Sequence, residues 1–171
     1  MSAEIAWHIE RWPQTIEEFD HLVEATQDEL VHFAAYRLGN REDAEDVVQD
    51  VYVQAFRDRE KRRKIADVRP YLFRMTGNHS TDFLRARSRR LREKDAVEPV
   101  HGDVSDSLAM RSLVDQLPER EAEVIRLRAW SGLQFAEIAI AVNSPLATVK
   151  TRFRLGIERL RKSFNLEGSP K

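Results

Sequence analysis

The chain has 171 residues and a formal net charge of -1, and hydrophobic residues make up 42% of it. That fraction is typical of a folded protein and excludes a wholly disordered one. Cysteine is absent, which excludes disulfides and thiolate metal sites. No apolar run approaches the roughly 18 residues that span a bilayer, and the N-terminal segment lacks the basic start and apolar core of a signal peptide. We therefore expect a cytoplasmic protein without membrane insertion.

Charges of like sign are grouped along the chain. Acidic residues outnumber basic ones by 13 to 4 in residues 1–57, and basic residues outnumber acidic ones by 12 to 4 in residues 58–92. The alternation repeats, with 9 acidic and 3 basic residues in 93–123 and 3 acidic and 9 basic residues in 124–171. An ordinary solvated surface mixes its charges more evenly. Two separate basic blocks suggest two contacts with a polyanion.

Helical periodicity dominates the first half, and only six glycines and six prolines interrupt the chain. The predicted class is therefore all-α. Two helices are predicted over 16–26 and 28–38, the second ending at Gly39. A third is predicted over 41–57 with Asn40 as its N-cap. The side opposite its apolar stripe faces outward and carries Asp46, Gln49, Asp50 and Val53.

A short charged loop is predicted over 58–68. Pro70 suits the start of the next helix, because its missing N–H costs nothing there, and that helix is predicted to run to about Arg92. Residues 93–107 contain a proline, a glycine and five acidic side chains without periodicity. We expect a flexible acidic linker between two small helical domains.

The C-terminal part has the layout of a helix-turn-helix module. Helices are predicted over 119–130 and 133–142, with Gly132 between them. Asn143 suits the left-handed conformation of a tight turn. Ser144 can cap the last helix and Pro145 can begin it. The apolar residues expected to pack inward on that helix are Leu146, Val149, Phe153, Ile157 and Leu160.

Six residues remain to face outward near the start of the last helix: Ala147, Thr148, Lys150, Thr151, Arg152 and Arg154. A recognition helix meets base edges and phosphates with this part of its surface. Threonine and alanine can contact thymine methyls, arginine can bind guanine bidentately, and lysine mostly holds phosphate. A solvated basic face on a helical bundle shows the same pattern, so spacing alone leaves both interpretations open.

Three stretches resemble region four of sigma factors of the extracytoplasmic-function (ECF) type: LPEREAEVIRLR, GLQFAEIAIAV and ATVKTRFRLGIERLR. Two stretches of the first half resemble region two in the same order: GNREDAEDVVQDVYVQAF, and RPYLFRMTGNHSTDFLRARSRR. The likeness covers roughly residues 15–162. Two motif blocks in the order and spacing of the family are a more specific signal than either block alone.

The resemblance implies a dissociable subunit of bacterial RNA polymerase that recognises promoters and opens them. It implies an N-terminal extension over 1–14, region two over 15–92, the linker over 93–107 and region four over 108–171. The implied partners are core RNA polymerase, promoter DNA and, where one exists, an anti-sigma factor. No cofactor, metal or enzymatic activity is expected, since no paired carboxylates, metal cluster or nucleophile constellation stands out.

The resemblance also assigns residues. Polymerase docking falls on Asp43, Asp46, Gln49 and Asp50. The minus-ten element is read around Asn78, whose amide suits the edge of an unstacked base. The other implied DNA contacts of the first domain are Lys61, Arg62, Arg63 and Lys64 in the loop, and Tyr71, Arg74, Arg85, Arg87, Arg89, Arg90 and Arg92 on the helix. The six outward residues of the last helix are implied to contact the minus-thirty-five element.

Two other hypotheses remain. A sigma-like module that sequesters an anti-sigma factor would need the apolar docking surface but not the basic faces, whereas this chain keeps both basic blocks and Asn78. A two-domain repressor that uses only the C-terminal module would leave residues 2–92 unexplained. We therefore favour promoter recognition.

Overall fold

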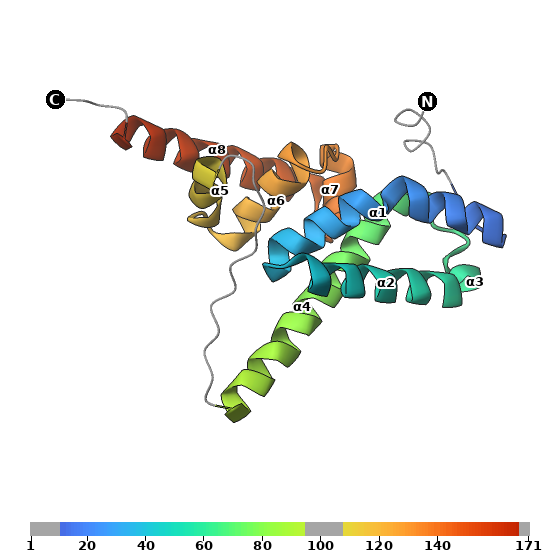
Figure 1. Ribbon diagram of the computed structural model, residues 1–171. Helices are drawn as coiled ribbons and strands as arrows, with labels where there is room; N and C mark the ends of the chain where they lie inside the picture. The colour runs from blue at the N-terminus through green and yellow to red at the C-terminus, as the bar shows by residue number, and fades with distance from the viewer. Residues whose placement is uncertain (1–10, 95–107, 168–171) are drawn as a thin grey trace. The chain divides into compact units, whose positions relative to one another are not determined.

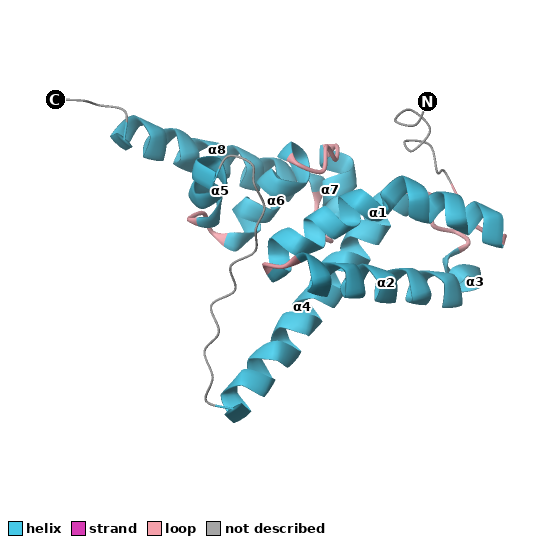
Figure 2. Ribbon diagram, viewed as in Figure 1, coloured by secondary structure: helices cyan, strands magenta, loops and turns pink. Residues whose placement is uncertain are grey.

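The computed structural model describes residues 11–94 and 108–167. Within these two ranges the chain forms helices joined by turns, without a strand (Figure 2). It divides into two compact units, residues 1–103 and 104–171. The prediction of an all-α protein with two small helical domains is confirmed. The expected linker lies outside the described residues from residue 95 onward. None of the described helices is long and apolar enough to span a membrane.

Three helices form the body of the first unit: α1 (Ile16–Leu38), α2 (Arg41–Arg57) and α4 (Val68–Lys94). Each packs on the other two, and α3 (Arg59–Arg62) is a single turn between α2 and α4 (Figure 1). The C-terminal half of α4 projects beyond α1 and α2. The buried side chains that fill the core include Leu22, Leu30, Phe33, Ala44, Val48, Val51, Leu72 and Phe73. Burial of these apolar groups is the main stabilising contribution to the unit.

Local signals set where the helices of the first unit begin and end. Gly39 adopts a left-handed φ of 83° and ends α1, which an L side chain would adopt only with strain. The Asn40 side chain accepts the Asp43 backbone N–H at 2.7 Å and begins α2 at the predicted residue. Thr15 and Glu18 form a reciprocal capping box at the start of α1. The backbone N–H of Gln14 donates to Glu18 at 2.8 Å and lowers the pKa of that carboxyl.

The prediction of two helices over 16–26 and 28–38 is wrong, because α1 is continuous. Neither glycine nor proline interrupts this stretch. The polar group at the expected break is satisfied within the bundle, since the buried Thr26 hydroxyl bonds the Leu22 carbonyl and the Tyr52 hydroxyl, each at 2.7 Å. A helix can therefore pass through Thr26 without leaving a buried donor or acceptor unpaired.

The segment predicted as a loop over 58–68 contains α3, and α4 begins at Val68, two residues before Pro70. Pro70 still lies within the first turn, where backbone N–H groups have no intrahelical partner. The start of α4 is held to α1 by the buried Arg69, whose guanidinium Nε donates to Glu29 at 2.9 Å.

The second unit contains α5 (Leu108–Asp115), α6 (Glu119–Ala129), α7 (Phe135–Ala141) and α8 (Leu146–Glu167). Its core includes the buried side chains of Val114, Ala122, Val124, Ile125, Leu127, Leu133, Ile138 and Val149. The helix predicted over 133–142 starts later, at Phe135. Leu133 is fully buried ahead of it, and Gln134 forms a capping box with Glu137.

α8 lies close against α6 at Gly156. A Cβ atom there would lie 2.6 Å from Cδ1 of Ile125 and 3.5 Å from Cβ of Glu121. Such a distance is shorter than any normal carbon contact, so Ile125 would have to move within a packed core. Gly77 in α4 differs, because a Cβ atom there would meet only the Phe33 ring, at 3.9 Å.

We expect Gly156→Ala to lower the free energy of unfolding by about 1–2 kcal/mol through overpacking. Gly77→Ala should raise it by about 0.5–1 kcal/mol, because alanine favours the helix and meets no clash. Urea unfolding of the full-length chain measures both. A Gly156→Ala variant as stable as Gly77→Ala would contradict the close contact of α6 with α8.

Burial raises the pKa of the Tyr52 phenol to about 12, from an ordinary value of 10. The contribution of this group to stability is complete below pH 10 and is lost as the pH rises toward 12, because only the unfolded chain ionises there. We expect Tyr52→Phe to lower the free energy of unfolding at neutral pH and to flatten its alkaline decline. Thr26→Val removes the same hydrogen bond and should keep the decline; equal slopes in the two variants would contradict this account.

Candidate nucleic-acid interface

The outward side of α2 is polar with one apolar residue at its end. Asp46, Gln49 and Asp50 are exposed as predicted. Val53, one turn further along, is 47% exposed. Carboxylates and an amide around an exposed aliphatic side chain make a surface that can bind basic groups and bury an apolar one.

Asp43 differs from these three residues, because it is half-buried and already bonded. Its carboxylate accepts the Asn40 amide at 2.6 Å and lies 3.4 Å from the Arg87 guanidinium of α4. Arg87 also donates to the Leu38 carbonyl at 3.4 Å. Asp43 and Arg87 thus join the α1–α2 turn to the C-terminal half of α4, and both have structural partners inside the unit.

The four loop residues predicted to contact DNA do not share one environment. Lys61, Arg63 and Lys64 are exposed. The Arg62 side chain is 11% exposed and lies 3.3 Å from Asp58. Hydrogen bonds from Lys61 and then Arg62 lower the pKa of the Asp58 carboxyl. The loop therefore presents three cations outward and turns the fourth inward.

Asn78 lies on an exposed part of α4. One turn before it, Arg74 is half-buried, with its guanidinium 5.9 Å from the ring of Tyr71. One turn after it, Asp82 is exposed and pairs with Arg85 at 3.5 Å. His79, which follows Asn78 directly, forms a hydrogen bond with the Gln54 side chain of α2 at 2.6 Å. An amide thus stands in solvent beside an arginine stacked on a tyrosine, which are groups that can bind the edge and the face of a base.

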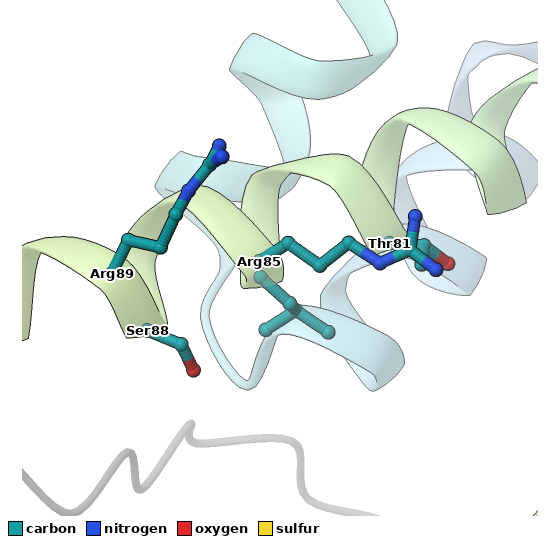
Figure 3. Close-up of a pocket in the computed structure, with 5 residues that line it drawn as sticks. Thr81, Arg85, Ser88 and Arg89 are labelled. Atoms are coloured by element: carbon teal, nitrogen blue, oxygen red, sulfur yellow. The ribbon is translucent and has the colours of Figure 1, made fainter.

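The C-terminal half of α4 carries the other cations. Arg85, Arg89 and Arg90 are exposed. A surface pocket is lined there by Thr81, Leu84, Arg85, Ser88 and Arg89. In Figure 3 the Arg85 side chain runs along the helix toward Thr81, and that of Arg89 points away from Ser88. The arginines alternate with small hydroxyl residues, a combination that suits contacts to backbone phosphates. The side chain of Arg92 lies outside the described residues.

In the second unit, α7 and α8 are joined by a tight turn. Asn143 adopts a φ of 47°, which confirms the predicted left-handed residue. The Val149 backbone N–H donates to the Pro145 carbonyl at 3.1 Å, so α8 starts from Pro145. The prediction that Ser144 caps α8 is wrong: its hydroxyl donates to the Val142 carbonyl at 3.3 Å and accepts from Arg152 at 3.1 Å.

The N-terminal half of α8 presents a mixed face to solvent. Ala147, Lys150, Thr151 and Arg154 are exposed, whereas Thr148 and Arg152 are half-buried. Arg154 pairs with Glu158 at 2.7 Å on the surface. The prediction that Leu146 packs inward is wrong, since its side chain is 41% exposed at the start of the helix. The apolar periodicity of the sequence includes Leu146. As the first residue of α8, however, Leu146 lies at the end of that stripe, where burial is not complete.

Among residues 11–94 and 108–167, no group of three or more His, Asp or Glu side chains is placed to hold a metal ion. The polar groups of the candidate interface are instead cations, amides and hydroxyls, which bind phosphates and base edges.

Two family models match the chain. Sigma-70 region 2 matches residues 22–90, and Sigma-70 region 4 matches residues 107–160. The first match covers α2, α3 and most of α1 and α4, and the second covers the helix-turn-helix with α5 and α6. Trp12 and the capping box of α1 precede the first match.

Curated relatives agree with these matches. The chain is 30% identical over 161 residues to the ECF RNA polymerase sigma factor SigE of Mycolicibacterium smegmatis, covering 84% of this chain and 60% of that protein. It is 26% identical over 165 residues to the ECF RNA polymerase sigma factor SigW of Bacillus subtilis, covering 85% and 88%. The chain thus spans about three fifths of SigE and most of SigW.

A solved structure has a similar fold. The sigma factor RpoE of Bartonella quintana, crystallised in complex with the anti-sigma factor NepR, superposes with a TM-score of 0.69 at 21% identity. The alignment covers 86% of this chain and 96% of that one. At this identity the likeness is one of fold.

The bonds of Asp43 predict that it stabilises the first unit. Asp43→Ala should lower the free energy of unfolding by about 1–2 kcal/mol, because Asn40 and Arg87 each lose a charged hydrogen-bond partner. Asp46→Ala, on the exposed side of the same helix, should change it by less than about 0.5 kcal/mol. Thermal unfolding of both variants measures the difference, and equal stabilities would contradict the structural role of Asp43.

Proposed function

Since the chain belongs to the sigma-70 family of RNA polymerase sigma factors, within its ECF group, we propose that it directs core polymerase to promoters and opens them. One observation carries the proposal. Both matched segments keep an exposed polar face suited to nucleic acid: one around Asn78 on α4 and one at the start of α8. A module that only sequestered an anti-sigma factor would need neither face.

The proposed polymerase contact is the outward side of α2. Asp46, Gln49 and Asp50 would pair with basic and polar groups of the polymerase, and the exposed Val53 adds apolar area to bury. Asp43 contributes indirectly, because its bonds to Asn40 and Arg87 hold the first turn of α2. We place region two at 15–92 and region four at 108–171, with residues 1–14 as an extension and 93–107 as the linker.

The proposed minus-ten contact lies on α3 and α4. Asn78 would bind the edge of an unstacked base, with Arg74 and Tyr71 supplying planar surfaces beside it. Lys61, Arg63 and Lys64 would hold phosphates from the loop, and Arg85, Arg89 and Arg90 would do so from the helix. Opening needs this arrangement, because an extruded base must find both an edge partner and a stacking partner.

The proposed minus-thirty-five contact is the N-terminal half of α8. Ala147 can touch thymine methyls, and Thr148 and Thr151 can do so or form hydrogen bonds with base edges. Lys150 and Arg154 would reach phosphates or guanine. Arg152 would act with Ser144, whose hydroxyl it bonds at 3.1 Å, to shape the turn that enters the major groove.

The proposed chemistry is binding, and synthesis belongs to the polymerase. The working location would be the cytoplasm, where polymerase and DNA meet. An anti-sigma factor is a proposed third partner, supported by the fold shared with RpoE in its complex with NepR. Its binding would compete with polymerase or with DNA for the faces described above.

Reconstitution tests the proposal. The full-length chain is mixed with core polymerase at low salt and with genomic promoter fragments, and run-off transcripts are mapped. We expect co-elution with core and transcripts from a defined set of promoters. A folded chain that binds an anti-sigma partner but never supports transcription would overturn the proposal.

Substitutions in the two DNA-binding faces should affect different steps of initiation. Asn78→Ala should reduce promoter opening about tenfold or more, as loss of a base-edge contact does, while binding to the upstream element is kept. Lys150→Ala should weaken upstream binding and reduce its salt slope by about one, as loss of a phosphate contact does. Permanganate reactivity measures opening, and filter binding against salt measures affinity.

Arg120→Ala supplies the control for Lys150, since Arg120 is an exposed cation of the same unit on α6. It should leave both steps unchanged. A loss of both steps in both variants would indicate misfolding and would contradict the assignment of separate roles.

A further inference from the structure

We propose that Trp12, ahead of the segment that the family models match, is a positioning residue that clamps the basic turn α3 through Arg62. The proposal deepens the proposed function, since this turn belongs to the minus-ten contact. It assigns to Arg62 a role different from those of its basic neighbours, and it gives the N-terminal extension a task in DNA opening.

Trp12 lies inside the first unit. Its side chain is 1% exposed. Its indole meets the ring of Tyr71, at the start of α4, edge to face with centroids 5.9 Å apart. An edge-to-face pair at this distance is attractive beyond the area that it buries. Trp12 is therefore anchored on the helix that carries Asn78.

Arg62 contacts both of these rings. Its guanidinium lies 5.6 Å from the centre of the Trp12 ring and 5.1 Å from that of Tyr71. Both distances fall within the range of cation–π attraction, which is strongest for tryptophan and for groups shielded from water. The same guanidinium pairs with Asp58 at 3.3 Å, where α2 ends. One side chain thus joins three segments: the extension, the end of α2 and the start of α4.

The position of Trp12 is itself fixed by the start of α1. The Gln14 backbone N–H donates to Glu18 at 2.8 Å, and the Gln14 amide donates to the Trp12 carbonyl at 2.9 Å. Arg11 also pairs with Glu18. The two Gln14 bonds tie the backbone at and after Trp12 to the start of α1, on the side from which the ring meets Arg62.

The clamp matters because α3 is a single turn with no buried residue of its own. Lys61, Arg63 and Lys64 point into solvent. Without a buried anchor, one turn of helix bearing like charges would open readily. Among the four cations Lys61 to Lys64, Arg62 is the one that turns inward. Its contacts thereby set the direction in which the other three face.

The opposing interpretation is that Arg62 holds a DNA phosphate, as the exposed cations would. Arg62→Lys separates the two. Lysine keeps the charge and would still hold a phosphate, but it lacks the planar guanidinium that lies near both rings and pairs with Asp58. The clamp requires Arg62→Lys to behave like Trp12→Ala, whereas a phosphate contact requires it to behave like the wild type.

The first experiment needs no DNA. Full-length Trp12→Ala, Trp12→Phe, Arg62→Lys and wild type are digested briefly with trypsin, and cleavage within residues 59–64 is followed by mass spectrometry. Cleavage from an open state tracks the population of that state. We expect about tenfold faster cleavage in Trp12→Ala and in Arg62→Lys, and a rate near that of the wild type in Trp12→Phe, whose ring still stacks.

Leu38→Ala is the structural control. Leu38 is fully buried at the far end of α1, roughly 30 Å along the helix from Trp12. It should destabilise the unit without faster cleavage in 59–64. Equal acceleration in Leu38→Ala, or no acceleration in Trp12→Ala, would overturn the clamp.

The second experiment uses holoenzyme on a promoter that the wild-type chain opens. Trp12→Ala and Arg62→Lys should each reduce opening about fivefold to tenfold, with polymerase binding and upstream binding retained. The double variant should lose little more than either single one, because both remove the same contact. Arg63→Ala should instead reduce the salt dependence of promoter binding, because it removes a phosphate contact.

Opening at wild-type rate by Arg62→Lys would overturn the clamp in favour of a phosphate contact. If the wild-type chain opens no promoter, the proposed function fails, and the trypsin experiment still decides whether Trp12 holds α3.

Discussion

Burial of one stripe of α4 constrains everything that the first unit can present to a partner. Leu72, Phe73 and Met75 lie against α1 and α2 almost without exposure. Leu72, Thr76 and Ser80 follow one another every four residues on the buried side of the helix, and Asn78 and Asp82 are turned away from them into solvent. The apolar packing thus orients the residues proposed to hold an unstacked base, and it does so without any contact to them.

Core packing also orients the exposed residues of the second unit. The fully buried Val149 sets the rotation of α8, and the close approach at Gly156 sets how near α8 comes to α6. The turn at Asn143 then fixes the angle at which α8 leaves α7. Lys150 and Thr151 point outward as a result of core packing and one left-handed residue.

Some basic residues of this protein bind partners inside a unit, and others are exposed to solvent. The number of basic residues in the sequence is therefore larger than the number available to bind DNA. The buried Arg69 pairs with Glu29, the buried Arg126 pairs with Asp115 and Glu119, and the half-buried Arg62 lies near two aromatic rings. These three arginines have their charged or aromatic partners inside the unit. The exposed arginines and lysines around them remain for a polyanion. A positive block in the sequence therefore combines a scaffold and a binding face.

The sequence by itself determined the helical class, two domains, the limits of α2, and the turns at Gly39, Gly132 and Asn143, because periodicity and backbone conformation are local properties. It also determined that Asp46, Gln49, Asp50, Asn78 and Lys150 face outward, since each lies opposite an apolar stripe. Only the tertiary structure decided that α1 continues through Thr26, that Leu146 is exposed, that Asp43 pairs with Arg87, and that Arg62 stacks on Trp12. Each of these depends on a partner 26 or more residues away in the chain, or on where neighbouring helices stop, and no local pattern encodes that distance.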